Sequence, residues 1–117
     1  MITIHLHKIL FFSYHGIHDE EKILGNEYEL YADIQFNEEQ EVIHSIQQTI
    51  NYVDIYQLIQ QRMSIPSPLL ETIIMDIGNT IKKKYEKVKL ISIHLKKIHP
   101  PVSGIQGSVA VSWKKEY

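Results

Sequence analysis

The sequence feature that most constrains the fold is an apolar stripe that begins shortly after a serine–proline pair. The stripe consists of isoleucines at spacings of three and four residues: Ile73, Ile74, Ile77 and Ile81. This spacing predicts a helix from about Leu70 to Ile81 with one buried face. Ser67 is expected to cap this helix, and Pro68 fits its first position, where a missing N–H costs nothing.

Glu71 lies in the first turn of this predicted helix. Free backbone N–H groups and the positive end of the helix dipole favour an ionised carboxylate there, which suits a group that accepts hydrogen bonds. Acidic residues are nevertheless common at helix starts. Position alone therefore identifies Glu71 only as a helix-start acid.

Length and composition indicate an ordinary globular protein with a single domain over residues 1–117. The apolar fraction is 44%, and a net charge of -2 gives no general attraction to nucleic acid or to an anionic membrane. The absence of cysteine excludes disulfides and thiolate metal sites, and it is compatible with the cytoplasm. The N-terminal residues lack a long apolar run, so we expect no signal peptide and no membrane-spanning segment.

The first predicted strand starts at Ile2, where apolar and polar residues alternate, and its β-prone run extends to about His15. Alternation puts His5 and His7 on the same face, which is also the spacing of two metal ligands on one strand. The sequence shows no evident third ligand. Histidines are also common on strand surfaces, so spacing alone is a weak motif.

The next segments of the chain are assigned from their polarity and spacing. Residues 16–25 are polar and predict a loop, and residues 27–36 alternate as a second strand. A long polar connection over residues 37–50 can hold one short turn of helix, and residues 51–63 have helical spacing.

Two further strands are predicted near the C-terminal end, over about residues 88–98 and 108–115. The order of elements is therefore strand, strand, helix, helix, strand, strand (ββααββ). This order predicts an α+β fold, with a four-stranded antiparallel sheet and both helices on one face. Lys82, Lys83 and Lys84 suit the solvated end of the second helix.

Five short motifs follow one another along nearly the whole chain. They are Tyr14-His15-Gly16, Glu21 four positions before Gly25, Thr49-Ile50-Asn51-Tyr52, Leu69-Leu70-Glu71 and Lys97-Ile98-His99-Pro100-Pro101. In this order and spacing they resemble the motifs of the dihydroneopterin aldolase family. That resemblance implies the tunnelling fold, in which strands and helices have the order predicted above. The chain departs from the family pattern at Val102-Ser103-Gly104-Ile105 and at Ser67-Pro68.

The resemblance also implies an activity in folate biosynthesis, the cleavage of 7,8-dihydroneopterin into 6-hydroxymethyl-7,8-dihydropterin and glycolaldehyde. A retro-aldol cleavage needs a base and an electron sink, which many aldolases build from a lysine Schiff base or a metal. A dihydropterin already carries a C=N bond beside the breaking carbon–carbon bond. We therefore expect no cofactor and no metal, and the protein supplies orientation and proton transfer.

The resemblance assigns roles to residues of this sequence. Glu71 anchors the pterin by accepting two parallel hydrogen bonds, and backbone groups near Leu70 share this work. Lys97 is the acid/base at the side-chain hydroxyl and ring nitrogen. Tyr52 helps to reprotonate the intermediate, and Glu21 positions water and substrate. Without the resemblance, Lys97 is a solvated strand-end lysine and Tyr52 a half-buried aromatic residue.

In this family the counterpart of Tyr52 comes from a neighbouring subunit, so the resemblance implies active sites at subunit interfaces. Rings of four subunits, which commonly stack into octamers, would also cover edge strands rich in Ile and Val. Three alternatives remain open at this stage. They are an epimerase acting on dihydroneopterin or its triphosphate, a non-catalytic ring that binds pterins or purines, and a zinc-dependent pterin synthase using His5 and His7.

Overall fold

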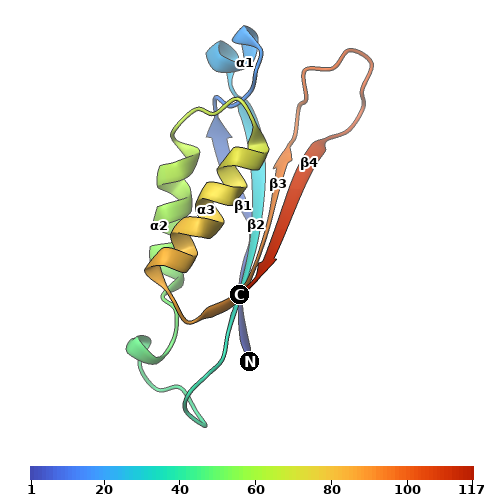
Figure 1. Cartoon of the computed structure of the whole chain (residues 1–117). Coiled ribbons are helices and arrows are strands. Elements are labelled where there is room, and N and C mark those ends of the chain that lie inside the picture. The colour runs from blue at the N-terminus through green and yellow to red at the C-terminus, as the bar shows by residue number, and fades with distance from the viewer.

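The computed structural model describes residues 1–117 as four strands, three α-helices and one 3₁₀ turn (Figure 1). Their order is β1 (Ile2–Ser13), α1 (Asp19–Leu24), β2 (Asn26–Phe36), η1 (Ile46–Gln48), α2 (Tyr52–Met63), α3 (Leu70–Lys84), β3 (Val88–Lys97) and β4 (Val109–Glu116). The strands form one antiparallel sheet in the order β1-β2-β3-β4, and α2 and α3 lie on the same face of it. The predicted α+β architecture is confirmed. No helix combines the length and the apolar character needed to cross a bilayer.

Alternation along the two central strands determines which side chains face the helices. In β2 the buried row is the predicted one: Tyr28, Leu30, Ala32, Ile34 and Phe36. In β3 the buried row runs through Ile91, Ile93 and Leu95, and the same two-residue period carries Lys97 onto this inner face. A lysine therefore occupies the last position of an otherwise apolar row.

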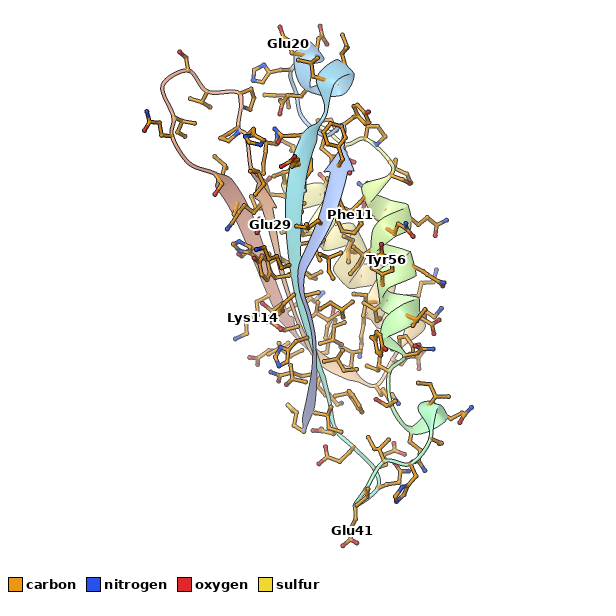
Figure 2. All side chains as sticks on the ribbon, turned by 180° about the vertical axis from the view of Figure 1, so that it is seen from behind. Phe11, Glu20, Glu29, Glu41, Tyr56 and Lys114 are labelled. Carbon is orange, nitrogen blue, oxygen red and sulfur yellow. The ribbon has the colours of Figure 1, made fainter.

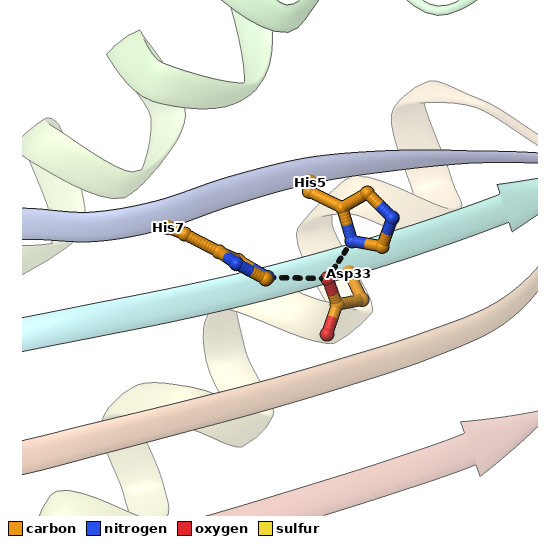
Figure 3. Close-up of side chains that lie close together, drawn as sticks. All are labelled: His5, His7 and Asp33. Carbon is orange, nitrogen blue, oxygen red and sulfur yellow. Dashed lines mark hydrogen bonds and ion pairs between the residues drawn. The ribbon is translucent and has the colours of Figure 1, made fainter.

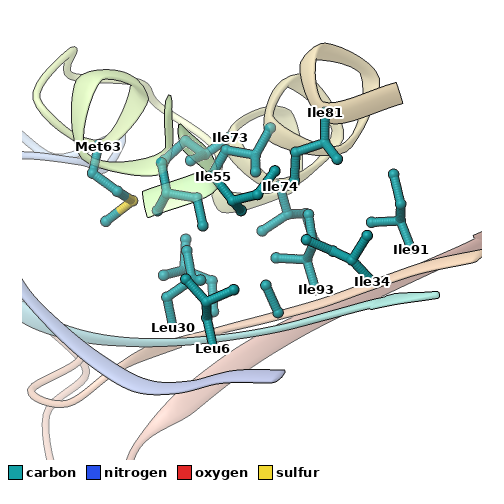
Figure 4. Close-up of a cluster of buried hydrophobic side chains, with 14 of the residues drawn as sticks. Leu6, Leu30, Ile34, Ile55, Met63, Ile73, Ile74, Ile81, Ile91 and Ile93 are labelled. Atoms are coloured by element: carbon teal, nitrogen blue, oxygen red, sulfur yellow. The ribbon is translucent and has the colours of Figure 1, made fainter. Parts of the chain in front are cut away.

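The helices bury their apolar faces on this sheet (Figure 4). The predicted isoleucine stripe of α3 is buried throughout: Ile73, Ile74, Ile77 and Ile81. Gly78 lies on the same face, where a Cβ would come within 2.0 Å of the Trp113 ring. Glycine at this position therefore allows α3 to approach β4 closely.

The edge strand β1 contains an irregularity that alternation did not predict. Pairing with β2 shifts between Leu6 and Ile9, and Lys8 has a φ of 55°. This bulge inserts one residue, so the apolar row continues on the inner face at Ile9 and Phe11. The ring of Phe11 then stacks on that of Tyr56 of α2, with centroids 6.3 Å apart (Figure 2).

Two predictions of local structure were wrong. Residues 16–25, predicted as a loop, contain the short helix α1, whose first turn holds Asp19, Glu20 and Glu21. Acidic residues at this position interact favourably with the positive end of the helix dipole and are a helix-start signal. In a segment that is polar throughout, this signal is hard to recognise. The 37–50 connection does hold one helical turn, η1, as expected.

The predicted start of α3 was also wrong. Ser67 does not cap the helix and Pro68 is not its first residue, because α3 begins at Leu70 with Leu69 in the capping position. The Ser67 hydroxyl instead accepts a hydrogen bond from Arg62 at 2.6 Å. The Ser67 backbone bonds to the His15 ring and to the Gly16 N–H, just after β1, and these bonds hold this segment outside the helix.

Candidate active site

A pocket of about 340 Å³ opens at the end of the sheet where β3 finishes. It lies between α1, the first turn of α3 and the loop that joins β3 to β4. The lining residues come from these segments and from β4: Gly16, Ile17, His18, Glu21, Pro68, Leu69, Leu70, Glu71, Lys97, Pro100, Pro101, Val102, Val109 and Val111. Four of the five predicted site residues are therefore brought together: Glu21, Leu70, Glu71 and Lys97.

The amine of Lys97 is bonded to the carboxylate of Glu21, and both side chains are buried. Lys97 reaches this position from the inner face of β3, and Glu21 reaches it from the last residue of the acidic first turn of α1. A buried lysine needs a partner, because desolvation of an unpaired charge is costly. Gly16 makes room for this pair, since a Cβ there would lie 2.3 Å from the Glu21 carboxyl group.

His15 is buried directly before Gly16, and its ring packs against that of Tyr28. Its Nδ1 accepts a hydrogen bond from the Ser67 backbone N–H at 3.1 Å, while the Gly16 N–H donates to the Ser67 carbonyl at 2.9 Å. Burial, together with the nearby charges of Arg62 and Lys97, lowers the pKa of His15 to about 4. The ring is therefore neutral at physiological pH. It ties the segment after β1 to the segment before α3, and its buried Nε2 has no hydrogen-bond partner.

The aromatic ring of Tyr28 lies beneath the amine of Lys97. The ring centroid lies 5.9 Å from the Lys97 Nζ, and the Tyr28 hydroxyl donates a hydrogen bond to the His15 carbonyl at 3.1 Å. Burial raises the pKa of the Tyr28 hydroxyl, and the Glu21 carboxylate raises it further. Tyr28 is therefore a neutral donor that joins the inner face of β2 to the segment after β1.

Asn26 holds the segment that follows Lys97. Its side-chain amide donates to the His99 carbonyl at 2.5 Å, and its carbonyl accepts from the His99 N–H at 3.2 Å. The same carbonyl oxygen accepts from the Glu27 N–H at 2.8 Å. These bonds fix the start of β2 against the end of β3, so the amine of Lys97 and the Pro100-Pro101 turn keep a defined position.

The opposite side of the pocket is the start of α3. Glu71 is exposed in the first turn, and Leu70 beside it is buried. No side chain caps this helix, so backbone N–H groups of the first turn remain available to a ligand. The pocket thus presents an amine and two carboxylates, together with backbone donors.

The fifth predicted site residue, Tyr52, does not reach this pocket within one chain. Tyr52 is 63% exposed at the first residue of α2, and α2 approaches the pocket only at its other end (Figure 1). A helix of 12 residues separates these ends by about 18 Å. The candidate metal ligands His5 and His7 are also outside the pocket, on the exposed side of β1 next to Asp33 of β2.

An α+β sheet that ends in a small pocket with a buried amine and carboxylates is typical of a protein that binds a small molecule. The chain belongs to the FolB dihydroneopterin aldolase family, whose model matches residues 4–114. It is therefore an enzyme of a folate-biosynthesis family.

Individual relatives agree with this assignment. A dihydroneopterin aldolase of Bacillus subtilis (strain 168) is 28% identical over 114 residues, covering 95% of this chain and 94% of that protein. The fold is similar to the Escherichia coli dihydroneopterin aldolase solved in complex with neopterin. That comparison has a TM-score of 0.85 and 13% identity, and it covers 98% of this chain and 99% of that one. A Burkholderia thailendensis dihydroneopterin aldolase bound to guanine has a TM-score of 0.77 at 13% identity, covering 99% and 91%.

Sequence reasoning did not find the supporting residues His15, Tyr28 and Asn26. In the sequence, His15 and Tyr28 stand out only as parts of a motif and of an apolar row. Their hydrogen bonds join segments that are 13 to 73 positions apart, and such partners leave no local pattern. For Asn26, the only signal is an amide directly after Gly25 at a strand start.

Proposed function

We propose that this enzyme cleaves 7,8-dihydroneopterin by a retro-aldol reaction, giving 6-hydroxymethyl-7,8-dihydropterin and glycolaldehyde. The proposal assigns no Schiff base and no metal to the reaction. The observation that carries it is the buried Lys97–Glu21 pair, which faces a pocket whose far side holds Glu71. An amine in this setting is held in place to move protons and is not simply a solvated lysine.

The substrate itself supplies the electron sink in this reaction. A base removes the proton from the hydroxyl on the 2' carbon of the side chain. As the bond between the 1' and 2' carbons breaks, the 2' carbon becomes the aldehyde carbonyl of glycolaldehyde. The electron pair of this bond moves into the adjacent ring C=N bond, and the ring nitrogen takes up a proton. Protonation of the remaining enamine carbon, with loss of the proton from the ring nitrogen, then restores the ring C=N bond and gives the hydroxymethyl product. The enzyme needs only to orient the substrate and to transfer these protons.

Each site residue has a role in this scheme. Lys97 acts as acid and base at the hydroxyl and the ring nitrogen, and Glu21 holds the amine and positions water and substrate. Glu71 accepts two parallel hydrogen bonds from the amino group and neighbouring N–H of the pterin, and backbone groups near Leu70 share this work. The relatives solved with neopterin and with guanine support this anchor, because both ligands carry that pair of donors on a six-membered ring.

Tyr52 completes the site from a second copy of the chain. Within one chain this residue is exposed and remote from the pocket, which favours a site built between subunits. The exposed edge strands support such an assembly, because β4 lines the pocket through Val109 and Val111 and has no further strand beside it. We propose a homo-oligomer with the tunnelling fold, in which four subunits form a ring and two rings form an octamer.

Three further properties belong to this proposal. Residues 1–117 act as one catalytic domain, the enzyme requires no cofactor, and it works in the cytoplasm. Its partners are the small-molecule pterin and other copies of the same chain, and nucleic acid and membranes are not among them. Interconversion of the 2'-epimers of the substrate is a side activity of the same site, in which the broken carbon–carbon bond forms again on the other face of the aldehyde.

The test is an anaerobic incubation of the purified oligomer with 7,8-dihydroneopterin in the presence of a chelator. Chromatography should detect 6-hydroxymethyl-7,8-dihydropterin and glycolaldehyde in equal amounts. Formation of the epimer alone would identify an epimerase and reject the cleavage reaction. Pterin binding without any product would identify a binding protein.

A further inference from the structure

A second group of chemically versatile side chains lies outside the pocket, on the sheet face that carries no helices. His5 and His7 of β1 converge there on Asp33 of β2 (Figure 3). Asp33 is five residues along β2 from Tyr28, the partner of Lys97 in the sheet, which corresponds to about 17 Å. The group therefore has no part in the pocket chemistry described above.

The donor atoms of these three side chains point to one place. His5 Nδ1 and His7 Nε2 both contact the same carboxylate oxygen of Asp33, with His7 at 2.7 Å. All three donor atoms lie within 4.8 Å of one another. Two imidazole nitrogens and one carboxylate oxygen within this distance can contact a single ion after small rotations of the side chains.

The bulge in β1 accounts for this convergence. His5 is the direct neighbour of Asp33 across the strands, but His7 reaches the same carboxylate diagonally. The shift in pairing lies between Leu6 and Ile9, so it includes His7 and also Lys8, which adopts the uncommon φ of 55°. Bulges increase local twist and redirect side chains, so this irregularity turns His7 toward Asp33.

We propose that His5, His7 and Asp33 bind one zinc ion, with water in the remaining coordination position. Zinc takes imidazole nitrogen and carboxylate oxygen in tetrahedral sites, whereas calcium and magnesium prefer sets of oxygen ligands. All three side chains are partly open to solvent, so the ion has an entry path and room for the water. Such a zinc site can form without a cysteine ligand, and this chain has no cysteine.

The charge of the group suits a cation. Asp33 provides a carboxylate oxygen, and the two imidazole rings provide nitrogen atoms that bind a metal ion in their neutral form. Binding of zinc would replace the hydrogen bonds that both rings now make with Asp33.

The ion would join the edge strand β1 to β2. Because the three ligands come from both strands and meet only in the folded sheet, zinc binding should stabilise the folded chain. It would leave the retro-aldol reaction unchanged, since Lys97 lies on the other face of the sheet.

Calorimetric titration of the chelator-treated oligomer with zinc chloride tests this site. We expect one zinc per chain in the unmodified protein, and much weaker binding in His7→Gln and Asp33→Asn. Loss of a supporting partner alone usually costs 10- to 100-fold in metal affinity, so loss of a direct ligand should cost about 100-fold or more. His44→Gln is the matched control, because His44 is exposed in the 37–50 connection, and its affinity should not change.

Nuclear magnetic resonance of the histidine rings provides a second measurement that needs no variant. Zinc should shift the ring signals of His5 and His7 and leave those of His44 in place. The proposal is overturned if the unmodified protein binds no zinc, or if either ligand variant keeps the unmodified affinity. Shifts confined to other histidines would overturn it as well.

Discussion

The ammonium group of Lys97 contacts the carboxylate of Glu21 inside the protein, although 76 positions separate the two residues in the sequence. The contact is possible because the period of β3 turns Lys97 toward the core and because α1 returns Glu21 over the end of the sheet. Neither side chain has another buried ionic partner. The pair therefore links the architecture of the sheet to the chemistry of the pocket.

We predict strong energetic coupling between Lys97 and Glu21. Lys97→Met and Glu21→Gln should each lower the free energy of unfolding by about 3–5 kcal/mol, because each leaves the other member of the pair buried without its ionic partner. The double variant should lose clearly less than the sum, since it leaves no charge unpaired. Urea unfolding measures all four proteins, and Lys96→Met, on the outer face of the same strand, is the control. Additive losses would show that the contact has no energetic weight.

Glu71 should determine pterin affinity. Glu71→Gln keeps the size of the side chain but removes its charge and one acceptor, so it should cost about 1.5–3 kcal/mol of binding free energy, or roughly 10- to 150-fold in Kd. Fluorescence titration with a non-cleavable pterin measures this loss. Glu41→Gln, in the long connection at the opposite end of the molecule, should bind normally (Figure 2). An unchanged Kd in Glu71→Gln would remove Glu71 from the site.

His15 should make stability depend on pH. Its pKa falls from 6.5 in the unfolded chain to about 4 in the folded chain, so between these values the unfolded chain binds more protons. The free energy of unfolding should therefore decrease as the pH falls from about 6.5 toward 4, by at most about 3 kcal/mol from this group.

The variant His15→Asn isolates this contribution. Its side-chain carbonyl can still accept the Ser67 N–H but does not titrate, so it should lack this part of the pH dependence. Urea unfolding of both proteins at pH 6.5, 5.5 and 4.5 measures the difference. Parallel stability curves for the two proteins would assign the pH dependence to other groups.

Much of the fold could be predicted from the sequence because its signals are local. The alternating row of β2 and the isoleucine stripe of α3 each identify an element and its buried face. The bulge at Lys8 could not be predicted, because no local signal marks it and the apolar row that resumes after it packs on a distant element, as Phe11 does on Tyr56 of α2. The start of α3 was wrong because Ser67 has tertiary partners that compete with capping.

The candidate site was predictable only in part. Motif resemblance identified Lys97, Glu21, Leu70 and Glu71, which the fold brings to one pocket. It could not show that Lys97 is buried, because that depends on the register of β3. Asp33 was likewise absent from the metal hypothesis for His5 and His7, since only the pairing of β1 with β2 brings it beside them.

Subunit complementation should reveal the source of Tyr52. Tyr52→Phe and Lys97→Ala should each lose cleavage activity, but in mixed oligomers some sites combine an intact Lys97 from one chain with an intact Tyr52 from another. Random mixing restores about one quarter of the sites in a ring. The measurement compares variants refolded together with variants refolded apart. Equal activity in the two samples would indicate that both residues act within one chain.

Turnover of 7,8-dihydroneopterin by Lys97→Ala, in the presence of a chelator, tests the central claim most directly. The proposed mechanism predicts that the unmodified protein and Lys96→Ala release glycolaldehyde at similar rates. In Lys97→Ala the rate should fall by about 10²- to 10⁴-fold, the usual contribution of a positioned acid/base, while pterin affinity is retained. Cleavage at the unmodified rate by Lys97→Ala would contradict the assignment of proton transfer to this lysine.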